Sequence, residues 1–459
     1  MSPISLDAIA RAISEADPLP LTGTVVRASG LVLEAALPRV PVGTACEIRA
    51  TDGATVLAEV VGFFGQTARL MPLADIHGIG EGCIVIPRAA ADRISVGEGL
   101  LGRVVDAALR PMDGGPVPML RARARLHATP PVAMERRRVV RPLPLGIRAI
   151  DACLTVGEGQ RLVIMAGPGV GKSVLLGMLA RSADADVVVV GLVGERGREV
   201  REFIERDLGE GLARAVVVVA TSDESPLKRV RAAMVATTVA EHFRSQGKRV
   251  LLLVDSLSRV AQAQREIGLA AGEPPTTKGY PPSSFAILPR LVERAGNDAG
   301  EGSITAFYTV LAEGDDLTDP VADAAKATLD GHIVLSRKIA EAGQFPAVDV
   351  LASISRVMND IVDPSHRELA RQARDVLSAY RESADLVEVG AYVAGSNPRV
   401  DRALRCIQAL QTFQRQEPDE RSTMSEMLAS LRRALAPQGA PGKEGFASIG
   451  LAPQGATRG

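Results

Sequence analysis

The chain has 459 residues, of which 46% are hydrophobic and 23% charged, which fits two or three domains that each bury a core. Its 53 basic and 54 acidic residues create no overall field that would attract nucleic acid or a membrane surface. No apolar run approaches the roughly 18 residues that a membrane-spanning helix needs, and the start, MSPISLDAIA, lacks the pattern of a secretory signal. The cysteines have no metal-ligand spacing, so we expect reduced thiols inside a cell; they are Cys46, Cys83, Cys153 and Cys406.

Residues 1–20 contain a short amphipathic pattern. Leu6, Ile9 and Ile13 recur at helical spacing. A helix this short is marginal in isolation, so it packs either on its own chain or on a partner protein. The spacing leaves both options open.

Residues 21–92 have a β-like texture. Short runs such as GTVVRAS, LVLEAAL and VLAEVVGF alternate with Gly, Pro and Asp-Gly turns. This spacing predicts a small closed β-barrel. Aromatic residues are few and are not interleaved with basic ones, which argues against a barrel that binds nucleic acid.

Residues 93–150 form a connecting region rich in Pro, Gly and Arg. The stretch from Arg121 to Arg141 carries seven arginines. Such a charge run is typical of a solvated, flexible or subunit-facing strap, and the alternative is a surface for an acidic partner or lipid.

The clearest motif is RLVIMAGPGVGKSVLLGMLA at 161–180. An apolar strand leads into a glycine-rich turn, where backbone N–H groups can converge on phosphate oxygens at a helix N-terminus. Lys172 would reach the β- and γ-phosphates, and the Ser173 hydroxyl would ligate Mg²⁺. The loop residues expected at the nucleotide are Ala166, where the usual pattern has glycine, Gly167, Pro168, Gly169, Val170, Gly171, Lys172, Ser173 and Val174. We therefore predict a phosphate-binding loop, with an accidental glycine-rich turn as the alternative.

Strands and helices alternate from about residue 157 to 354, which predicts a parallel sheet covered by helices. Asp255 ends a buried strand, at the edge where such sheets bind ligands, and would hold Mg²⁺ through its water shell. Glu195 follows another strand and could orient water at the γ-phosphate, whereas Glu199 and Glu202 lie in the helix beyond it. Arg356 is a candidate external arginine, with a structural ion pair as its alternative.

The last part of the chain changes character again. Residues 363–436 have a helical pattern, and residues 437–459 form a tail rich in Ala, Pro and Gly that repeats LAPQGA. A segment so rich in small residues cannot bury a core, so we expect disorder there.

Several motifs together resemble the type III protein-export ATPases, a family related to the catalytic subunit of the rotary ATP synthase. These motifs are GPGVGKSVLLGMLAR, GLVGERGREVREFIE, VLLLVDSLSR, KGYPPSSFAILPRLVERAG, LDGHIVLSRKIAEAG and FPAVDVLASISRVM. The resemblance covers about residues 20–410. Within the family, the flagellar branch is the most similar, on RASGLVLEA, TAFYTVL and DLVEVGAYVAGSNP.

The resemblance implies an α/β fold: a RecA-like P-loop ATPase core at 93–362, after a β-barrel and before a helical domain. It implies that Lys172 and Ser173 bind phosphate and Mg²⁺, and that Glu195, with Arg196 beside it, is catalytic. It makes Asp255 the Mg²⁺-side aspartate and Arg356 an arginine finger that reaches a neighbouring subunit. Phe345 stands where relatives commonly place tyrosine against adenine, and a phenyl face can still stack.

The implied activity is Mg²⁺-dependent ATP hydrolysis that energises protein export. The implied assembly is a homohexamer with a coiled-coil stalk protein in its pore and a stator-like dimer on the N-terminal segment. Its further partners would be an export gate at the membrane and chaperone–cargo complexes, with no nucleic acid. The implied location is the cytoplasmic side of the inner membrane export apparatus.

Four alternatives stay open. An injectisome ATPase shares this chemistry but exports different proteins, and an ATP-synthase-like subunit fits the run ERGREV at 195–200 less well. A non-catalytic ring subunit would not need glutamate at position 195. A hexameric RNA translocase would need more basic and aromatic residues in its barrel.

Overall fold

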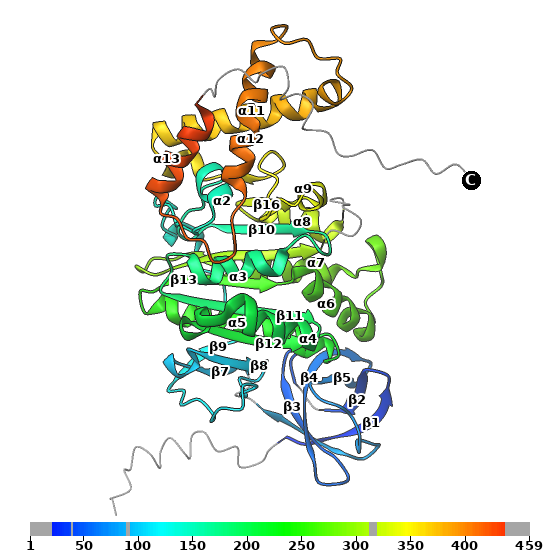
Figure 1. The fold of residues 1–459 in the computed structure, drawn as a ribbon. Coiled ribbons are helices and arrows are strands. Elements are labelled where there is room, and N and C mark those ends of the chain that lie inside the picture. Colours follow the sequence, from blue (N-terminus) through cyan, green and yellow to red (C-terminus); the bar gives the residue numbers. More distant parts are fainter. Residues whose placement is uncertain (1–20, 38–39, 89–91, 312–318, 437–459) are drawn as a thin grey trace, which may run out of the picture.

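The computed structural model describes residues 21–37, 40–88, 92–311 and 319–436. A β-barrel, a central α/β unit and a helical unit follow one another along the molecule (Figure 1). The expectations for the N-terminal segment 1–20 and for the tail 437–459 lie outside the described residues. In the part of the chain that is described, no helix is both long and apolar enough to cross a membrane.

The barrel is closed by six strands in the order β1-β2-β5-β4-β3-β6. The strands are β1 (Gly23–Ser29), β2 (Val32–Ala36), β3 (Ala45–Arg49), β4 (Thr55–Phe64), β5 (Thr67–Pro72) and β6 (Ile84–Arg88). Alternate residues point inward and build a separate core around Leu33, Ile48 and Leu70. The predicted barrel is confirmed.

The central sheet has the order β17-β16-β10-β15-β13-β11-β12-β8, and β14 pairs with β15 outside this path. Its strands are β8 (Arg103–Asp106), β10 (Arg161–Ala166), β11 (Val187–Glu195), β12 (Ala215–Thr221), β13 (Arg249–Asp255), β14 (Gly296–Asn297), β15 (Ser303–Leu311), β16 (Gly331–Leu335) and β17 (Ile354–Ser355). All pairs from β16 to β8 are parallel, so the carboxyl ends of these strands share one edge. The mostly parallel α/β core is confirmed.

Helices cover both faces of the sheet. One face packs against α5 (Pro226–Ser245), α6 (Leu257–Ala271), α7 (Pro282–Val292) and α8 (Pro320–Thr328). The other face packs against α2 (Arg148–Cys153), α3 (Lys172–Ser182), α4 (Gly197–Glu202) and the π-helical turn η3 (Phe203–Leu208). Neighbouring strand residues such as Leu251 and Leu252 belong to different cores, because side chains alternate across a strand.

The connecting region is more ordered than a flexible strap. Strand β8 joins the sheet beside β12, and β7 (Arg93–Val96) pairs with β9 (Ala122–Arg125). The Arg136 guanidinium donates to the carbonyl oxygens of Ala295 and Glu293, and Arg137 donates to that of Gly302. For these two arginines the expectation of a solvated strap is wrong, because they bind backbone carbonyls of their own chain.

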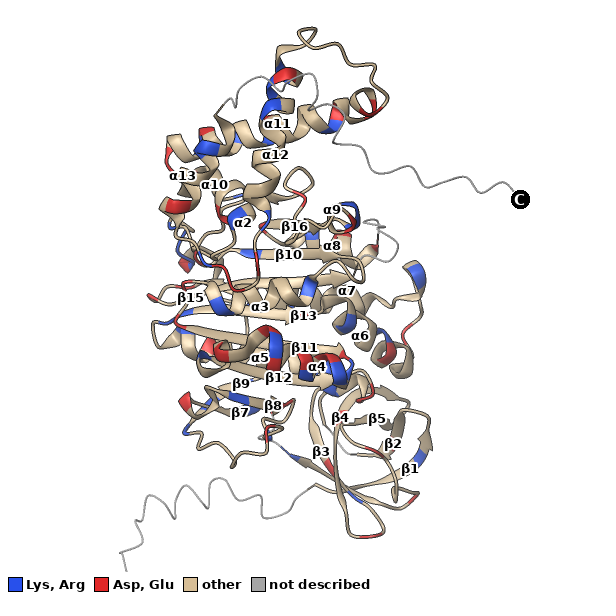
Figure 2. Cartoon of the chain, in the orientation of Figure 1, with Lys and Arg blue, Asp and Glu red and all other residues tan. Residues whose placement is uncertain are grey.

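The last described part of the chain consists of helices that pack on the central unit. After the short helices α9 (Arg337–Glu341) and α10 (Met358–Ile361), these are α11 (Pro364–Glu388), α12 (Pro398–Gln414) and α13 (Met424–Leu435). Ala373, Leu410 and Leu431 share one core with α2 and α3. The predicted helical domain is confirmed. Basic and acidic residues alternate along the ribbon, as on α4 (Figure 2).

Candidate active site

The glycine-rich loop connects β10 to α3. Gly169 and Gly171 have φ angles of 77° and 86°, a left-handed conformation that favours glycine. Helix α3 begins at Lys172, directly after Gly171. Its first N–H groups therefore face the carboxyl edge of the sheet, where an anion would be stabilised.

Three charged side chains from different strand ends meet at this edge. The Lys172 ammonium lies 2.6 Å from Asp255 Oδ1 and 3.3 Å from Glu195 Oε1. Strands β10, β13 and β11 bring them together, with β15 lying between β10 and β13. Thr309 of β15 donates its hydroxyl to Asp255 Oδ1 at 2.6 Å. Sequence reasoning missed Thr309, because a threonine inside an apolar strand carries no signal of what it faces.

The environment of Glu195 favours its protonated form. Burial, followed by the negative charge of Asp255, raises the pKa of Glu195 to about 7, although Lys172 opposes the rise. Burial alone would lower the pKa of Lys172, but the Asp255 and Glu195 carboxylates outweigh it and raise that pKa above its usual value. The site thus holds a charged lysine beside a carboxyl group that titrates near neutral pH.

Two residues at the start of α4 lie next to Glu195. Glu199 lies in this helix, as expected, but its carboxyl group still hydrogen-bonds with Glu195 and helps to raise the pKa of Glu195. The Arg196 side chain is 82% exposed and lies 3.9 Å from Glu199. The guanidinium of Arg196 thus points to solvent in the single chain.

Few side chains at the site could bind a metal ion, and they offer oxygen atoms as ligands. Within the described ranges, no group of three or more His, Cys, Asp or Glu side chains could hold a metal ion. The Ser173 hydroxyl and the carboxylates of Asp255 and Glu195 offer oxygen atoms. Mg²⁺ is usually held by one or two protein oxygens together with water and substrate phosphates, so this donor set fits Mg²⁺ bound with a nucleotide.

A pocket of about 340 Å³ opens beside the loop. Phe345, 44% exposed, lies on its wall, and a Cβ atom at Gly171 would lie 3.4 Å from the Phe345 ring. Another part of the wall comes from the segment 415–418 after α12. Its Gln416 N–H donates to the Phe345 carbonyl oxygen at 2.8 Å. Sequence reasoning missed this wall, because its segment lies far from the motif along the chain.

Arg259 of α6 is a second residue that sequence reasoning missed. Its side chain packs against Gly194, the residue before Glu195, and its Nε is buried without a hydrogen-bond partner. A buried donor without a hydrogen-bond partner destabilises the fold unless a ligand accepts its hydrogen bond. The signal was present in VDSLSR, where Arg259 follows Asp255 by four residues, in the first turn of the helix after the strand.

Arg356 lies away from the site of its own chain. It follows β17, which pairs with the amino end of β16, and its N–H donates to the Asp330 carbonyl oxygen. The glycine-rich loop lies at the opposite, carboxyl end of the neighbouring strand β10. The exposed guanidinium makes one contact of 3.3 Å, to the Lys326 carbonyl oxygen. Arg356 therefore has no part in the site of the single chain.

Three family profiles match the chain in the order of its units. The β-barrel domain of the ATP synthase alpha/beta family matches residues 25–88. The nucleotide-binding domain of that family matches residues 146–355. The T3SS EscN ATPase C-terminal domain matches residues 362–433.

Curated relatives carry two kinds of name. A flagellum-specific ATP synthase of Pseudomonas aeruginosa is 52% identical over 421 residues, which cover 90% of this chain and 93% of that protein. A flagellum-specific ATP synthase of Bacillus subtilis is 50% identical and covers 89% and 94%. A type 3 secretion system ATPase of Sinorhizobium fredii is also 50% identical and covers 90% and 91%.

Solved structures agree in fold. The assembled ATPase EscN from the type III secretion system of enteropathogenic E. coli has a TM-score of 0.85 and 41% identity, over 90% of this chain and 100% of that one. EscN in complex with its central stalk EscO has a TM-score of 0.83. The chain belongs to the family of flagellar and type III secretion export ATPases, which is related to the ATP synthase alpha and beta subunits.

Proposed function

We propose that this ATPase uses Lys172, Ser173, Asp255 and Glu195 to hydrolyse Mg²⁺-bound ATP. The observation that carries the proposal is the meeting of Lys172 with Asp255 and Glu195 beside the glycine-rich loop. When ATP enters, its phosphates would replace the carboxylates as partners of Lys172, and the loop N–H groups from Gly167 to Ser173 would hold them.

The freed carboxylates then have separate roles. Asp255 and the Ser173 hydroxyl would hold the hydrated Mg²⁺, which supplies charge neutralisation at the phosphates. Glu195 would orient the attacking water and accept its proton, and the Arg259 guanidinium would bind the departing phosphate. Arg196 would serve only where a neighbouring subunit turns it inward.

Phe345 and the segment 415–418 would form the base pocket. The adenine ring would stack on the exposed Phe345 ring, with the segment 415–418 forming another part of the wall.

The chain would work as a ring. The EscN structures are described as assembled and in complex with a central stalk, and Arg356 is exposed and remote from its own site. We infer a homohexamer in which Arg356 completes the neighbour's site, a coiled-coil stalk turns in the pore, and a stator-like dimer binds residues 1–20. This ring would act at the cytoplasmic face of the membrane, at an export gate supplied by chaperone–cargo complexes.

The exported proteins would be those of the flagellum. Flagellum-specific relatives reach 52% identity, against 50% for a type 3 secretion ATPase. Because this difference is small, export through an injectisome is the second candidate.

The test replaces only Glu195 by Gln in the source bacterium and scores filament protein outside the cells and swimming. The matched control is Glu205→Gln on η3, where the Glu205 carboxylate forms an exposed ion pair with Arg201 of α4. Loss of both readouts at normal protein levels, with the control unaffected, is the expected result. Normal filaments would overturn the flagellar proposal, and loss of other secreted proteins instead would favour an injectisome.

A further inference from the structure

A second pocket, of about 560 Å³, lies at the far end of α3 from the glycine-rich loop. Since α3 has 11 residues, the two ends are about 16 Å apart along the helix. The lining residues come from the end of α3, from the 3₁₀ turn η4 (Gly209–Arg214) and from the segment after α12. They are Arg181, Ser182, Ala183, Asp184, Glu210, Gly211, Ala213, Arg214 and Arg421.

Arg214 brings a partly buried positive charge to this pocket. Its guanidinium donates to the carbonyl oxygens of Ala180, Arg181, Ala183 and Ala185, at 2.7 to 3.0 Å. These carbonyls close the end of α3 and favour a cation there. They are neutral acceptors, however, so they satisfy the hydrogen bonds of Arg214 without cancelling its charge.

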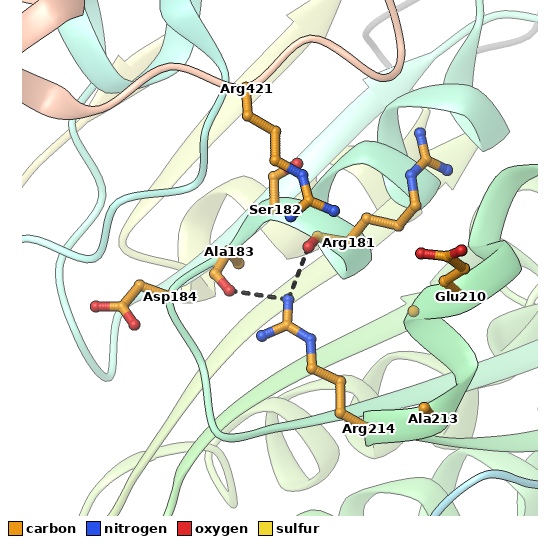
Figure 3. A pocket seen from close by; sticks show the side chains of 9 residues that line it. Arg181, Ser182, Ala183, Asp184, Glu210, Ala213, Arg214 and Arg421 are labelled. Carbon is orange, nitrogen blue, oxygen red and sulfur yellow. Dashed lines mark hydrogen bonds between the residues drawn. The ribbon is translucent and has the colours of Figure 1, made fainter.

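Arg421 adds a second cation that faces the first. Figure 3 shows the Arg421 and Arg214 side chains pointing toward one another across the pocket. Burial and then the charge of Arg421 lower the pKa of Arg214. The Arg421 side chain makes no hydrogen bond or ion pair with any described residue, unlike Arg214 and Arg181. Two facing guanidinium groups repel one another unless an anion lies between them.

The acids near the pocket offset this repulsion only in part: the carboxylates of Asp184 and Asp186 act to raise the pKa of Arg214, but burial and Arg421 outweigh them. Asp184 is engaged by Arg249, with contacts of 3.0 and 3.1 Å. Glu210 lies on η4, beyond Arg181 in the view of Figure 3. The pocket therefore keeps an excess of positive charge between Arg214 and Arg421.

A phosphate group fits this arrangement better than a single carboxylate does. Its two charges match the two guanidinium groups: its oxygen atoms can accept hydrogen bonds from the Arg421 fork, while the Arg214 guanidinium attracts the second charge. A carboxylate offers one charge and would leave one arginine unpaired.

The pocket also shares a wall with the nucleotide pocket. Arg181 donates to the Pro418 carbonyl oxygen at 2.8 Å, and Pro418 lines the pocket beside Phe345. The segment from Arg415 to Arg421 thus has one end at the nucleotide and the other at the paired arginines. A group that holds Arg421 would also hold this segment in place.

We propose that the pocket between α3, η4 and the segment 415–421 binds a phosphate group through Arg421 and Arg214, and that its occupation tightens nucleotide binding next door. The second half of this proposal rests on the proposed function. The site is separate from the glycine-rich loop, and it accepts inorganic phosphate or the phosphoryl group of a small organic ester.

The first experiment titrates the full chain with inorganic phosphate at constant ionic strength, by calorimetry. A saturating non-hydrolysable ATP analogue with Mg²⁺ fills the glycine-rich loop. We expect Arg421→Ala to bind phosphate roughly tenfold more weakly, since it loses charge-assisted hydrogen bonds. Arg432→Ala removes an equal charge from the exposed side of α13 and should bind phosphate as the unchanged chain does. Equal phosphate affinity in all three proteins would overturn the proposal.

Further arms identify the ligand. A titration with glycerol phosphate in place of inorganic phosphate shows whether the site binds a phosphate ester or the free ion. Binding of either ligand supports the site if it is lost in Arg421→Ala. Arg421-dependent binding of a glutamate-rich peptide without binding of either phosphate would overturn the assignment in favour of a protein-docking surface.

A separate arm tests the link to the nucleotide. Phosphate should raise the affinity of the unchanged chain for a fluorescent ATP analogue about fivefold, which is at the low end of the coupling usually found between two sites. In Arg421→Ala, phosphate should leave this affinity unchanged. Equal affinities with and without phosphate would overturn the coupling. The phosphate titration is repeated without nucleotide, so that failure to bind the ATP analogue counts against the proposed function and not against the phosphate site.

Discussion

Glu195 shows how its surroundings set the chemistry of one side chain. Burial and the nearby Asp255 raise the pKa of Glu195 to about 7. A carboxyl group must be ionised to accept a proton from water. The activity of the free enzyme should therefore depend on pH in a range where an ordinary glutamate is fully ionised.

We predict that kcat/KM for ATP falls about tenfold per pH unit below about pH 7, because Glu195 then keeps its proton. Glu199→Ala removes a hydrogen bond that raises the pKa of Glu195, so the fall should begin at a lower pH. The measurement is the pH profile of kcat/KM for both proteins. A profile that stays level from pH 5.5 to 8 would show that Glu195 is not the base.

Phe345 is expected to act in binding and not in the chemical step. Stacking of a base on an aromatic ring contributes about 1–3 kcal/mol. Phe345→Ala should therefore raise KM for ATP by roughly tenfold with little change in kcat, whereas Phe345→Tyr keeps the ring and should behave as the unchanged chain. Steady-state kinetics test this, and an unchanged KM in Phe345→Ala would remove Phe345 from the base pocket.

The sequence predicted the charged part of the site better than its surroundings. Lys172, Glu195 and Asp255 each follow a strand, and parallel strands end at one edge, so their meeting could be foreseen. Thr309 and Gln416 could not, because their contacts depend on strand order and on how a distant segment folds back. The role of Arg356 as an arginine finger was assigned by resemblance, and its position excludes contact with the glycine-rich loop of its own chain.

The ends of the two buried strands that carry the acidic residues were predicted to within one residue. Asp255 ends β13 as expected, whereas Glu195, expected just after its strand, is the last residue of β11. Strand β8 was missed, because it is short and pairs at a sheet edge inside a Pro- and Gly-rich region. The helix after β11 turns into the π-helical turn η3 at Phe203, which hydrophobic spacing does not distinguish from an α-helix.

Helix α3 depends on a glycine where it passes η3. A Cβ atom at Gly177 would overlap the carbonyl oxygen of Asp207. Gly177→Ala should therefore destabilise the chain by about 1–3 kcal/mol, since the backbone of η3 must move. Gly80→Ala meets no atom within 4 Å and is the matched control. Thermal unfolding tests this, and equal melting temperatures would show that α3 and η3 separate without strain.

The assembled ring is where Arg356 is expected to act. An arginine finger contributes about 10³ to 10⁵ in rate in other phosphoryl-transfer enzymes, so Arg356→Ala should hydrolyse almost no ATP while the single chain remains folded. Glu195→Gln should bind nucleotide with little turnover. The Arg356→Ala subunit keeps an intact Glu195, and the Glu195→Gln subunit keeps an intact Arg356.

We predict that mixing Arg356→Ala with Glu195→Gln restores part of the ATPase activity, because some interfaces then contain an intact Glu195 and an intact Arg356. Mixing either variant with itself at the same total concentration is the control. If the mixture stays as inactive as its components, Arg356 does not act across the interface.

The three cores of the molecule differ in how far they could be exchanged between relatives. The barrel closes a core of its own, whereas the core on the α3 face is shared by the sheet and by α11, α12 and α13. The barrel meets its neighbour at few buried positions, such as Val32 and Met71, so a barrel recombined as a module has to match the neighbouring core only there. The helical end cannot be exchanged in this way, because its removal uncovers the face that carries the nucleotide loop. Variation in what the helical end recognises must therefore arise by substitution on its outer surface, while the barrel can be exchanged if these few contacts are kept.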